Sequence, residues 1–298
     1  MEYIFIVNGR KDKASIRTEV ERQLNVVEVI PSYEIYVTKG PGDATQYVFG
    51  QCVDRPDDEI CFVACGGDGT LNEVACGIMK AGHPSGKKLA VFATGSANDF
   101  IKYYKGKDFH SVEALLKATE HKIDILKVGD RYSINVINFG FDSIVGRVGN
   151  KLSEKGWKNP YRYGIIAAIF TGRFNRIDVV ADGVKIGGKR MLLCTLANNH
   201  YVGGDFFCAP RARNNDGLID VCLMKITSLL SFLHALPVYV AGRHLDDPKH
   251  SKKFIYRQAK HVEVSARHNI DLCLDGEMVS GTHFEIDIIP GAISLMVP

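Results

Sequence analysis

The stretch that most constrains this chain is residues 61–74, where an apolar run ends in a cluster of glycines. Residues 59–65 are almost all apolar, as expected of a strand that is covered on both faces of a parallel sheet. Residues 66–69 read Gly-Gly-Asp-Gly, and glycine permits positive φ and the close approach of another group to the backbone. We therefore expect a buried strand, a tight turn and the start of a helix in immediate succession.

The start of that helix predicts an anion site. Thr70 and Glu73 have the spacing of a capping box, which places the beginning of the helix at Leu71. Free N–H groups and the positive end of the helix dipole then face the turn, which favours phosphate. A glycine turn without a ligand, as in ordinary α/β domains, is the alternative. Asp68 argues against it, because an acid among phosphate-binding amides repels phosphate unless a metal or a catalytic role compensates.

Residues 1–100 alternate between strand-like and helix-like segments. We expect strands at residues 3–7, 33–37, 59–65 and 89–92, and helices at residues 15–25, 42–53 and 71–79. This alternation predicts a parallel sheet. Ligands of such sheets bind beyond the carboxyl ends of the strands, where residues 66–70 lie.

A second glycine segment follows the fourth expected strand. Residues 93–100 read Ala-Thr-Gly-Ser-Ala-Asn-Asp-Phe, and Ser96 and Asp99 have the spacing of a capping box with Asp in place of Glu. A second helix N-terminus would then point to the same edge of the sheet. A capped helix start without a ligand is the alternative.

The pattern changes at residue 123, where we place a domain boundary. Residues 123–136 read as strand, Gly-Asp turn and strand, which indicates a hairpin. Further strand-like segments lie at residues 176–181, 191–198, 218–224, 261–266, 272–275 and 284–289. The sequence thus predicts an α/β domain over residues 1–122 and a mostly antiparallel β-sandwich over residues 123–298. Two apolar helical segments, 161–174 and 229–240, are either core helices or a wall for an acyl chain.

Composition narrows the functional class. The formal net charge of +3 is too small to indicate nucleic-acid binding. None of the eight cysteines forms a CxxC pair, so a zinc site is not expected. We expect the cysteines to be reduced thiols in the core of a cytoplasmic protein. The first apolar run is too short for a signal peptide, and no run approaches the ~20 residues of a membrane span.

The motifs resemble those of a known family. Gly-Gly-Asp-Gly-Thr at 66–70, followed by Asn72 and Glu73, resembles the nucleotide-binding motif of the diacylglycerol, sphingosine and ceramide kinases. The NAD kinases share a shorter version, and Asn-Asp-Phe at 98–100 favours the lipid kinases. Two departures are Gly9, where the family has Pro after the Asn, and Ser96, where it has Thr. The family's Pro two residues before Gly95 is also absent here.

The resemblance implies that ATP with Mg²⁺ binds at the carboxyl edge of the first domain. The implied nucleotide-binding residues are Asn8, Thr38, Gly66, Gly67, Asp68, Gly69, Thr70, Asn72, Glu73, Gly95, Ser96 and Asn98.

Residues 209–218 resemble the signature of the family's second domain, which implies a further Mg²⁺ site. The carboxylate of Asp216 and the backbone carbonyls of Arg213 and Leu218 would be its ligands. Oxygen-only coordination suits a hard cation. Without the resemblance, Asn-Asp-Gly at 215–217 reads as a plain turn.

Residues 275–277 read Asp-Gly-Glu, as they do in this family. Phosphoryl transfer to a hydroxyl needs a carboxylate that accepts or orients the proton, and Mg²⁺ to screen the phosphates. The resemblance implies that Glu277 is the base, that Asp275 is its partner or a metal-linked acid, and that Asp68 binds the catalytic Mg²⁺ through water. In the sphingosine branch the acid of the glycine motif is the base, so the division of roles stays open. A hairpin turn is the alternative for Asp275 and Gly276.

The sequence therefore favours an ATP-dependent lipid kinase with its catalytic groups in a cleft between two domains. Diacylglycerol is the foremost acceptor, giving phosphatidic acid, with sphingoid bases and ceramide behind it. The enzyme would be cytoplasmic and would contact the inner face of the membrane transiently, without binding nucleic acid. A homodimer is one option, since the sequence leaves the oligomeric state open. The rival hypotheses are an NAD kinase-like phosphotransferase and a nucleotide-binding regulator without catalysis.

Overall fold

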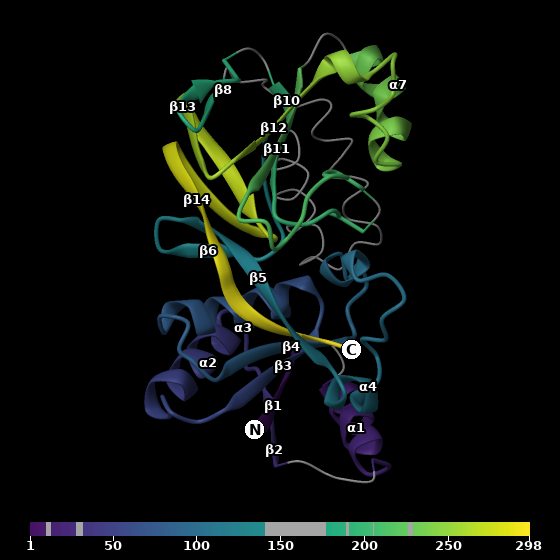
Figure 1. Cartoon of the computed structure of the whole chain (residues 1–298), viewed down its shortest axis with the longest axis vertical. Coiled ribbons are helices and arrows are strands. Elements are labelled where there is room, and N and C mark those ends of the chain that lie inside the picture. Colours follow the sequence, from purple (N-terminus) through teal and green to yellow (C-terminus); the bar gives the residue numbers. More distant parts are fainter. Residues whose placement is uncertain (10–12, 28–31, 141–176, 189–190, 205, 226–228) are drawn as a thin grey trace. The chain divides into compact units, whose positions relative to one another are not determined.

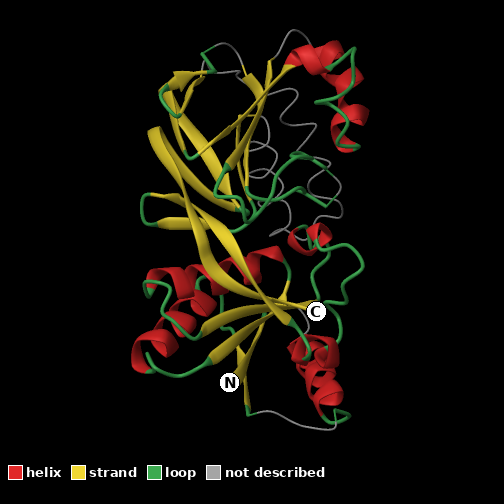
Figure 2. Cartoon of the chain, viewed as in Figure 1, coloured by secondary structure: helices red, strands yellow, loops and turns green. Residues whose placement is uncertain are grey.

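A computed structural model describes the whole chain except residues 10–12, 28–31, 141–176, 189–190, 205 and 226–228 (Figure 1). The chain forms two compact units. Unit 1 consists of Met1–Ile125 and Pro290–Pro298, and unit 2 consists of Leu126–Ile289. Most of the described helices belong to unit 1, whereas unit 2 is built mainly of strands (Figure 2).

Unit 1 is built on a parallel sheet with the strand order β4-β3-β1-β2. The strands are β1 (Glu2–Val7), β2 (Tyr33–Val37), β3 (Ile60–Gly66) and β4 (Lys87–Ala93), and the helices between them are α1 (Lys13–Leu24), α2 (Asp43–Asp54) and α3 (Asp68–Lys80). The register pairs Val7 with both Val37 and Cys65, and Gly66 with Ala93. The carboxyl ends of the four strands therefore lie level at one edge, and the predicted parallel sheet is confirmed.

Packing explains why the central segments fold this way. Every residue of β3 is buried, as its apolar sequence predicts. On one side α2 and α3 approach each other closely, because Gly77 of α3 has no side chain. A Cβ atom at Gly77 would lie 2.7 Å from Cβ of Val48 and 2.9 Å from the carbonyl oxygen of Thr45, both in α2. The glycine thus sets the distance between the two helices.

Both predicted capping boxes are wrong. Helix α3 begins at Asp68 instead of Leu71, and its N-cap, Gly67, makes no side-chain capping hydrogen bond. The hydroxyl of Thr70 instead accepts a hydrogen bond from the side chain of Asn8. After β4, residues 94–99 form a loop, and only a short 3₁₀ turn, η1 (Phe100–Tyr103), follows without a side-chain cap.

A further short helix of unit 1 follows η1. It is α4 (Val112–Leu116), and its N-cap Ser111 accepts a hydrogen bond from the backbone N–H of Ala114 at 3.1 Å.

Unit 2 is mostly antiparallel, as predicted. Its strands form the order β12-β11-β10-β7-β13-β14, with β8 paired to β13. Two strands have residues in both units, namely β5 (Thr119–Val128) and β14 (Glu277–Val297). The other elements of unit 2 are β6 (Arg131–Ser133), β7 (Val136–Gly140), β8 (Ile177–Ala181), β9 (Val184–Lys185), β10 (Met191–Ala197), β11 (Ile219–Lys225), α7 (Leu229–Val240), η2 (Ser251–Lys253), β12 (Phe254–Ala259) and β13 (His261–Leu274).

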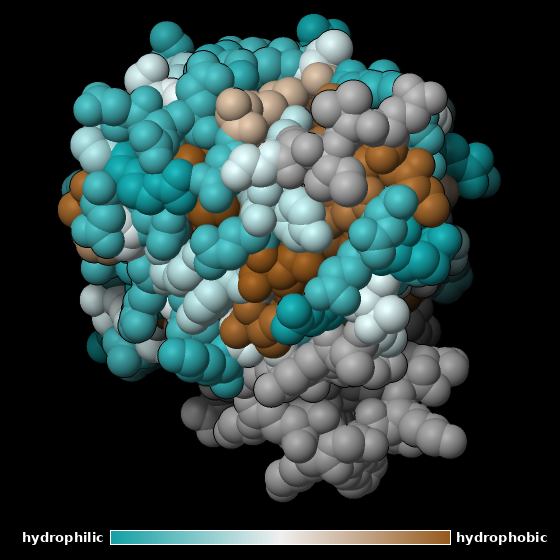
Figure 3. All heavy atoms as spheres, turned by 90° about the horizontal axis from the view of Figure 1, so that it is seen from below, coloured by the Kyte–Doolittle hydropathy of each residue, from teal (hydrophilic) through white to brown (hydrophobic). Residues whose placement is uncertain are grey.

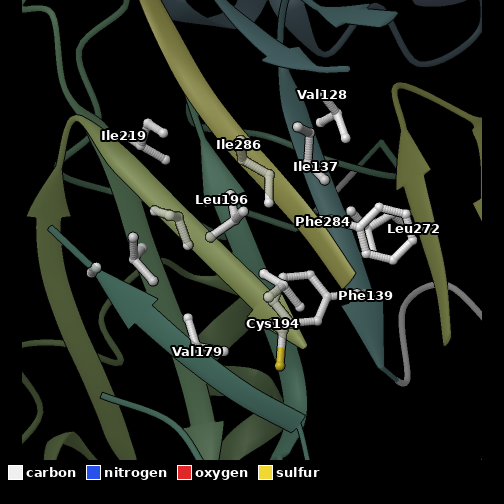
Figure 4. Close-up of a cluster of buried hydrophobic side chains, with 14 of the residues drawn as sticks. Val128, Ile137, Phe139, Val179, Cys194, Leu196, Ile219, Leu272, Phe284 and Ile286 are labelled. Atoms are coloured by element: carbon white, nitrogen blue, oxygen red, sulfur yellow. The ribbon is translucent and has the colours of Figure 1, made fainter. Parts of the chain in front are cut away.

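Side chains from these strands converge on one buried apolar cluster (Figure 4). The cluster includes Ile137 and Phe139 of β7, Leu196 of β10, Leu272 of β13 and Ile286 of β14, all nearly inaccessible to solvent. Alternating residues of each strand reach it, which is the pattern of a sheet with one face turned to a core.

The unit boundaries differ from the predicted domains. The first segment of unit 1 ends at Ile125 instead of residue 122, and Pro290–Pro298 belongs to unit 1 although the sequence placed it in the second domain. The reason is a parallel pairing of the end of β14 with β4, in which Ser294 lies opposite Lys88. The predicted hairpin over residues 123–136 is confirmed as β5 and β6. The expected helix over 161–174 lies outside the described residues, and that over 229–240 is α7.

Within the described ranges, no helix has both the length and the apolar character needed to cross a membrane. Hydrophilic residues cover most of the described surface in Figure 3, and hydrophobic residues gather near the centre of that view. The exposed large hydrophobic side chains include Phe49 and Val53 of α2, and single exposed apolar residues of this kind are normal.

The close approach of α2 and α3 leads to a first prediction. Gly77→Ala should destabilise the protein by about 1–2 kcal/mol, because its methyl group must push against Val48 and the Thr45 carbonyl. Gly50→Ala in α2 is the matched control, since nothing lies within 4 Å of the added Cβ and alanine should stabilise the helix by about 0.5–1 kcal/mol. Urea unfolding of the two variants checks this, and equal stability would contradict the packing argument.

Candidate functional site

The glycine turn joins the buried end of β3 to the start of α3. A Cβ atom at Gly66 would lie 2.3 Å from Oγ1 of Thr70, so only glycine leaves room for that side chain. Gly67 is extended, with φ −100° and ψ −166°, and α3 begins at the next residue. The first N–H groups of this helix and the positive end of its dipole therefore lie at the carboxyl edge of the sheet, as an anion site requires.

The second glycine segment packs directly against this turn. The backbone N–H groups of Thr94 and Gly95 donate to the carbonyl of Gly66 at 3.0 and 3.2 Å. A Cβ atom at Gly95 would lie 2.4 Å from Cα of Gly67, so the two backbones touch without side chains between them. The two sequence motifs, separated by most of α3 and β4, thus form a single backbone surface.

Asp68 connects these two motifs. Its Oδ1 accepts a hydrogen bond from the backbone N–H of Phe100 at 2.9 Å. Burial raises the pKa of the Asp68 carboxyl above its usual range, and the nearby Asp99 raises it further. A carboxyl group with a raised pKa is a better proton acceptor when ionised, which suits a group that works in acid–base chemistry.

Asp99 is a residue that the sequence analysis did not assign to the site. It is only 5% exposed and forms an ion pair with Lys102 at 2.7 Å. The residue before it, Asn98, has φ 47° and donates from its side chain to the carbonyl of Gly95 at 2.9 Å. The Asn-Asp pair of the motif therefore shapes the loop. An acid that follows a Gly-rich loop and lies next to a buried Phe is the signal that would have found it.

The end of β1 contributes two further contacts. The side-chain amide of Asn8 donates to Oγ1 of Thr70 at 2.9 Å, and the backbone N–H of Gly9 donates to Oγ1 of Thr38 at 2.9 Å. Thr38 follows β2, so three neighbouring strands bring these residues to the same edge.

The structure thus brings most of the predicted nucleotide-binding residues together, but Asn72, Glu73 and Ser96 are placed differently. Asn72 and Glu73 lie beyond the first residues of α3. Asn72 is buried within the helix, and the backbone carbonyl of Glu73 accepts a hydrogen bond from Thr45. Ser96 is exposed in the loop after β4.

In unit 2, residues 275 and 276 form a two-residue turn between β13 and β14. Asp275 and Gly276 have φ values of 46° and 98°, and Leu274 pairs with Glu277. Positive φ at both positions is typical of a type I′ hairpin, which Asp-Gly favours. The hairpin reading of Asp275 and Gly276 is therefore correct as far as the backbone is concerned.

The carboxylate of Asp275 is used to hold this turn. It accepts hydrogen bonds from the Ser133 hydroxyl at 2.7 Å and from the backbone N–H groups of Asn135 and Val136 at 3.0 and 2.9 Å. Glu277 is different, because its side chain is 55% exposed and its nearest ion-pair partner, Arg131, lies 3.7 Å away. Of these two acids, Glu277 has the carboxylate that is free to meet a ligand from solvent.

The Asn-Asp-Gly turn lies just before β11. Asp216 is exposed, its Oδ1 accepts a hydrogen bond from the N–H of Leu218 at 3.1 Å, and its Oδ2 lies 3.4 Å from the side-chain amide of Gln258. Within the described residues no group of three or more His, Cys, Asp or Glu side chains could hold a metal ion. A cation at this turn would therefore need backbone carbonyls beside the carboxylate, which is the donor set of a hard ion. Arg213 is exposed in the same segment.

Asp220, four residues further on, is a buried acid that the sequence analysis missed. It is 0% exposed, and the Tyr256 hydroxyl donates to its Oδ1, while its Oδ2 has no hydrogen-bond partner in the described structure. Burial raises the pKa of Asp220 to about 6, and Asp216 adds to this shift. An acid inside an otherwise apolar strand was the available signal.

Two family models match this chain. Residues 2–128 match the diacylglycerol kinase catalytic domain, and residues 135–297 match the YegS C-terminal NAD kinase beta sandwich-like domain.

Named relatives and solved structures agree with these matches. The chain is 32% identical over 252 residues to a diacylglycerol kinase of Staphylococcus carnosus (strain TM300), covering 81% of this chain and 77% of the relative. It is 30% identical over 276 residues to a probable lipid kinase YegS-like of Cronobacter sakazakii (strain ATCC BAA-894), covering 89% and 86%. A putative diacylglycerol kinase from Bacillus anthracis str. Sterne has the same fold, with a TM-score of 0.75, 22% identity and coverage of 100% and 97%.

The buried acid of β11 gives a prediction for the pH dependence of stability. Because the pKa of Asp220 is raised, the folded state holds its proton more tightly than the unfolded chain does. Ionisation of Asp220 should therefore lower the free energy of unfolding progressively as the pH rises from about 4 to about 6, by at most about 3 kcal/mol. Above that range its contribution should stay constant.

Asp220→Asn should remove this dependence and make the protein more stable than wild type near pH 7. Urea unfolding with a chelator present, at several values between about pH 4 and about pH 7, measures the effect. Parallel stability curves for wild type and variant over that range would show that Asp220 does not titrate as its burial requires.

Proposed function

Because this chain belongs to the lipid kinase family that carries the diacylglycerol kinase catalytic domain, we propose that it transfers the γ-phosphate of ATP to a lipid hydroxyl. Diacylglycerol is the acceptor that we expect, and phosphatidic acid the product. Some relatives are named diacylglycerol kinase and others probable lipid kinase, so the choice of diacylglycerol goes beyond what these names have in common.

The observation that carries the proposal is the backbone contact between the two glycine motifs. Gly67 and Gly95 touch through their main chains, and Gly66 accepts hydrogen bonds from the second motif. A surface of main chain without Cβ atoms, next to the N-terminus of a helix of 13 residues, can approach a triphosphate closely. This supports ATP as the phosphoryl donor.

ATP enters such a reaction with Mg²⁺, which screens the negative charge of its phosphates. Asp68 fits a contact to that ion through water, because one of its oxygens is fixed by Phe100 and its position is at the start of α3. In the proposed reaction Glu277 accepts the proton of the lipid hydroxyl, whose oxygen forms the new bond to the γ-phosphorus while ADP leaves. Asp275 positions Glu277 by holding the hairpin turn.

We place a second, structural cation at the turn before β11. Asp216 would supply a carboxylate oxygen, and Arg213 and Leu218 would supply backbone carbonyls, which suits Mg²⁺. The acceptor lies in a bilayer, so the proposal also includes transient peripheral contact with the inner face of the membrane. The oligomeric state is not part of the proposal.

Transfer of labelled γ-phosphate from Mg-ATP to a panel of lipids in mixed micelles tests this proposal. The panel contains diacylglycerol, a sphingoid base, ceramide and, as the acceptor of the rival enzyme class, NAD. We expect labelled phosphatidic acid from the wild-type protein. Label in NAD alone would replace the proposal with an NAD kinase. ATP binding without any labelled product would leave a nucleotide-binding regulator.

Two variants test the assigned roles in the same assay. Glu277→Gln and Asp68→Asn should each lower turnover by about 100-fold or more, because each removes a carboxylate that acts on the proton or on the metal-bound phosphates. Glu285→Gln is the matched control, since Glu285 is also an exposed acid of β14, with a 66% exposed side chain. Near-normal turnover of Glu277→Gln beside an inactive Asp68→Asn would move the role of base to Asp68.

A further inference from the structure

Asn8 and Gly9 make two hydrogen bonds that share one feature: in both, a threonine hydroxyl is the acceptor. The Asn8 amide donates to Thr70 at 2.9 Å, and the Gly9 backbone N–H donates to Thr38 at 2.9 Å. Thr38 and Thr70 are 7% and 6% exposed. Both hydroxyls lie in unit 1, since Thr38 directly follows β2 and Thr70 lies in the first turn of α3.

The direction of these bonds determines what each hydroxyl can still do. A hydroxyl group has one proton to donate and lone pairs to accept with. An N–H group can only donate, so in both contacts the threonine oxygen is the acceptor and keeps its own proton. Within the described residues, neither hydroxyl proton has an acceptor. A buried donor without a partner is costly, so both hydroxyls are set to donate to a group that binds there.

Backbone contacts hold both of these residues in place. The Asn8 N–H bonds to the carbonyl of Cys65 in β3, and the Thr38 N–H bonds to the carbonyl of Val7 in β1. Gly9 is pressed against the end of β2, since a Cβ atom there would lie 1.8 Å from the Thr38 carbonyl oxygen. A proline at this position would have no N–H to donate to Thr38. Glycine at position 9 therefore supplies both the space and the hydrogen.

We propose that Asn8 and Gly9 are positioning residues. They orient the hydroxyls of Thr38 and Thr70 so that both donate hydrogen bonds to the phosphates of the nucleotide. The inference rests on the proposed function for the identity of the anion. It adds the means by which the two hydroxyls are turned into donors, and it assigns a role to Gly9, a residue that would otherwise only be a small turn residue.

Nucleotide affinity measured by calorimetry tests the hydroxyl donors. Thr38→Val and Thr70→Val should each weaken ATP binding about tenfold, which is the contribution of one hydrogen bond to a charged group. Thr38→Ser and Thr70→Ser keep the hydroxyl and should bind ATP within about threefold of wild type. Adenosine has no phosphates, so its affinity should be the same in all five proteins.

Adenosine separates this role from a structural one. A valine variant that merely disturbs the fold would lose adenosine and ATP alike, and that result would overturn the inference. Equal ATP affinity of wild type and both valine variants would also overturn it while leaving the proposed function intact. Failure of the wild-type protein to bind ATP would instead count against the proposed function itself.

Asn8→Asp tests the orienting role directly. The new carboxylate can only accept, so it should take the proton of Thr70 and reverse the direction of that hydrogen bond. It also adds a negative charge, which repels phosphate whatever Thr70 does. We therefore compare Asn8→Asp in wild type with Asn8→Asp in the Thr70→Val background, where only the charge can act.

The loss of ATP affinity caused by Asn8→Asp should be about fivefold or more greater in wild type than in the Thr70→Val background. The same loss in both backgrounds would mean that Asn8 acts through charge alone and would overturn its orienting role. Thermal unfolding of each variant, measured without nucleotide, shows that the compared proteins are folded.

Discussion

The site of unit 1 depends on one steric condition: Gly66, Gly67 and Gly95 must meet without side chains. A single methyl group at Gly66 or Gly95 would lie within 2.4 Å of Thr70 or Gly67. This contact closes the loop after β4 onto the start of α3, and the hydrogen bonds from Thr94 and Gly95 to Gly66 hold it there. The sheet beneath it, with four strand ends level at one edge, provides the rigid base for these loops.

The acids of the conspicuous motifs are used in two different ways. Asp68 and Asp275 each accept hydrogen bonds from backbone N–H groups, so each holds a loop or turn in place. Within the described residues no backbone N–H donates to the carboxylate of Glu277, and its side chain is 55% exposed. Asp275, which holds a turn, and the exposed Glu277 therefore stand only two residues apart in the sequence, and only their contacts distinguish them.

The sequence allowed the fold class to be predicted because its two halves have different periodicities. Continuous apolar runs such as β3, followed by glycine and helix, are diagnostic of a parallel sheet covered on both faces. The helix starts were predicted wrongly because a capping box is a local rule, whereas the Thr70 hydroxyl is taken by Asn8, a residue 62 positions away. A contact of that kind leaves no trace in the spacing of nearby residues. The hydrogen bond from Tyr256 to Asp220, 36 positions away, is a contact of the same kind.

The chain does not complete its units in the order in which they begin. Met296 belongs to the same buried cluster of unit 1 as Phe92 of β4, and the backbone N–H of Gly291 donates to the buried carboxylate of Asp124 at 2.7 Å. These partners come from β4 and β5, which are synthesised before nearly all of unit 2. On the ribosome, the outer edge of β4 therefore stays without its neighbour strand until unit 2 has been made. Unit 1, the unit that begins first, is finished last, so an exposed strand edge is an inherent hazard of the biosynthesis of this protein.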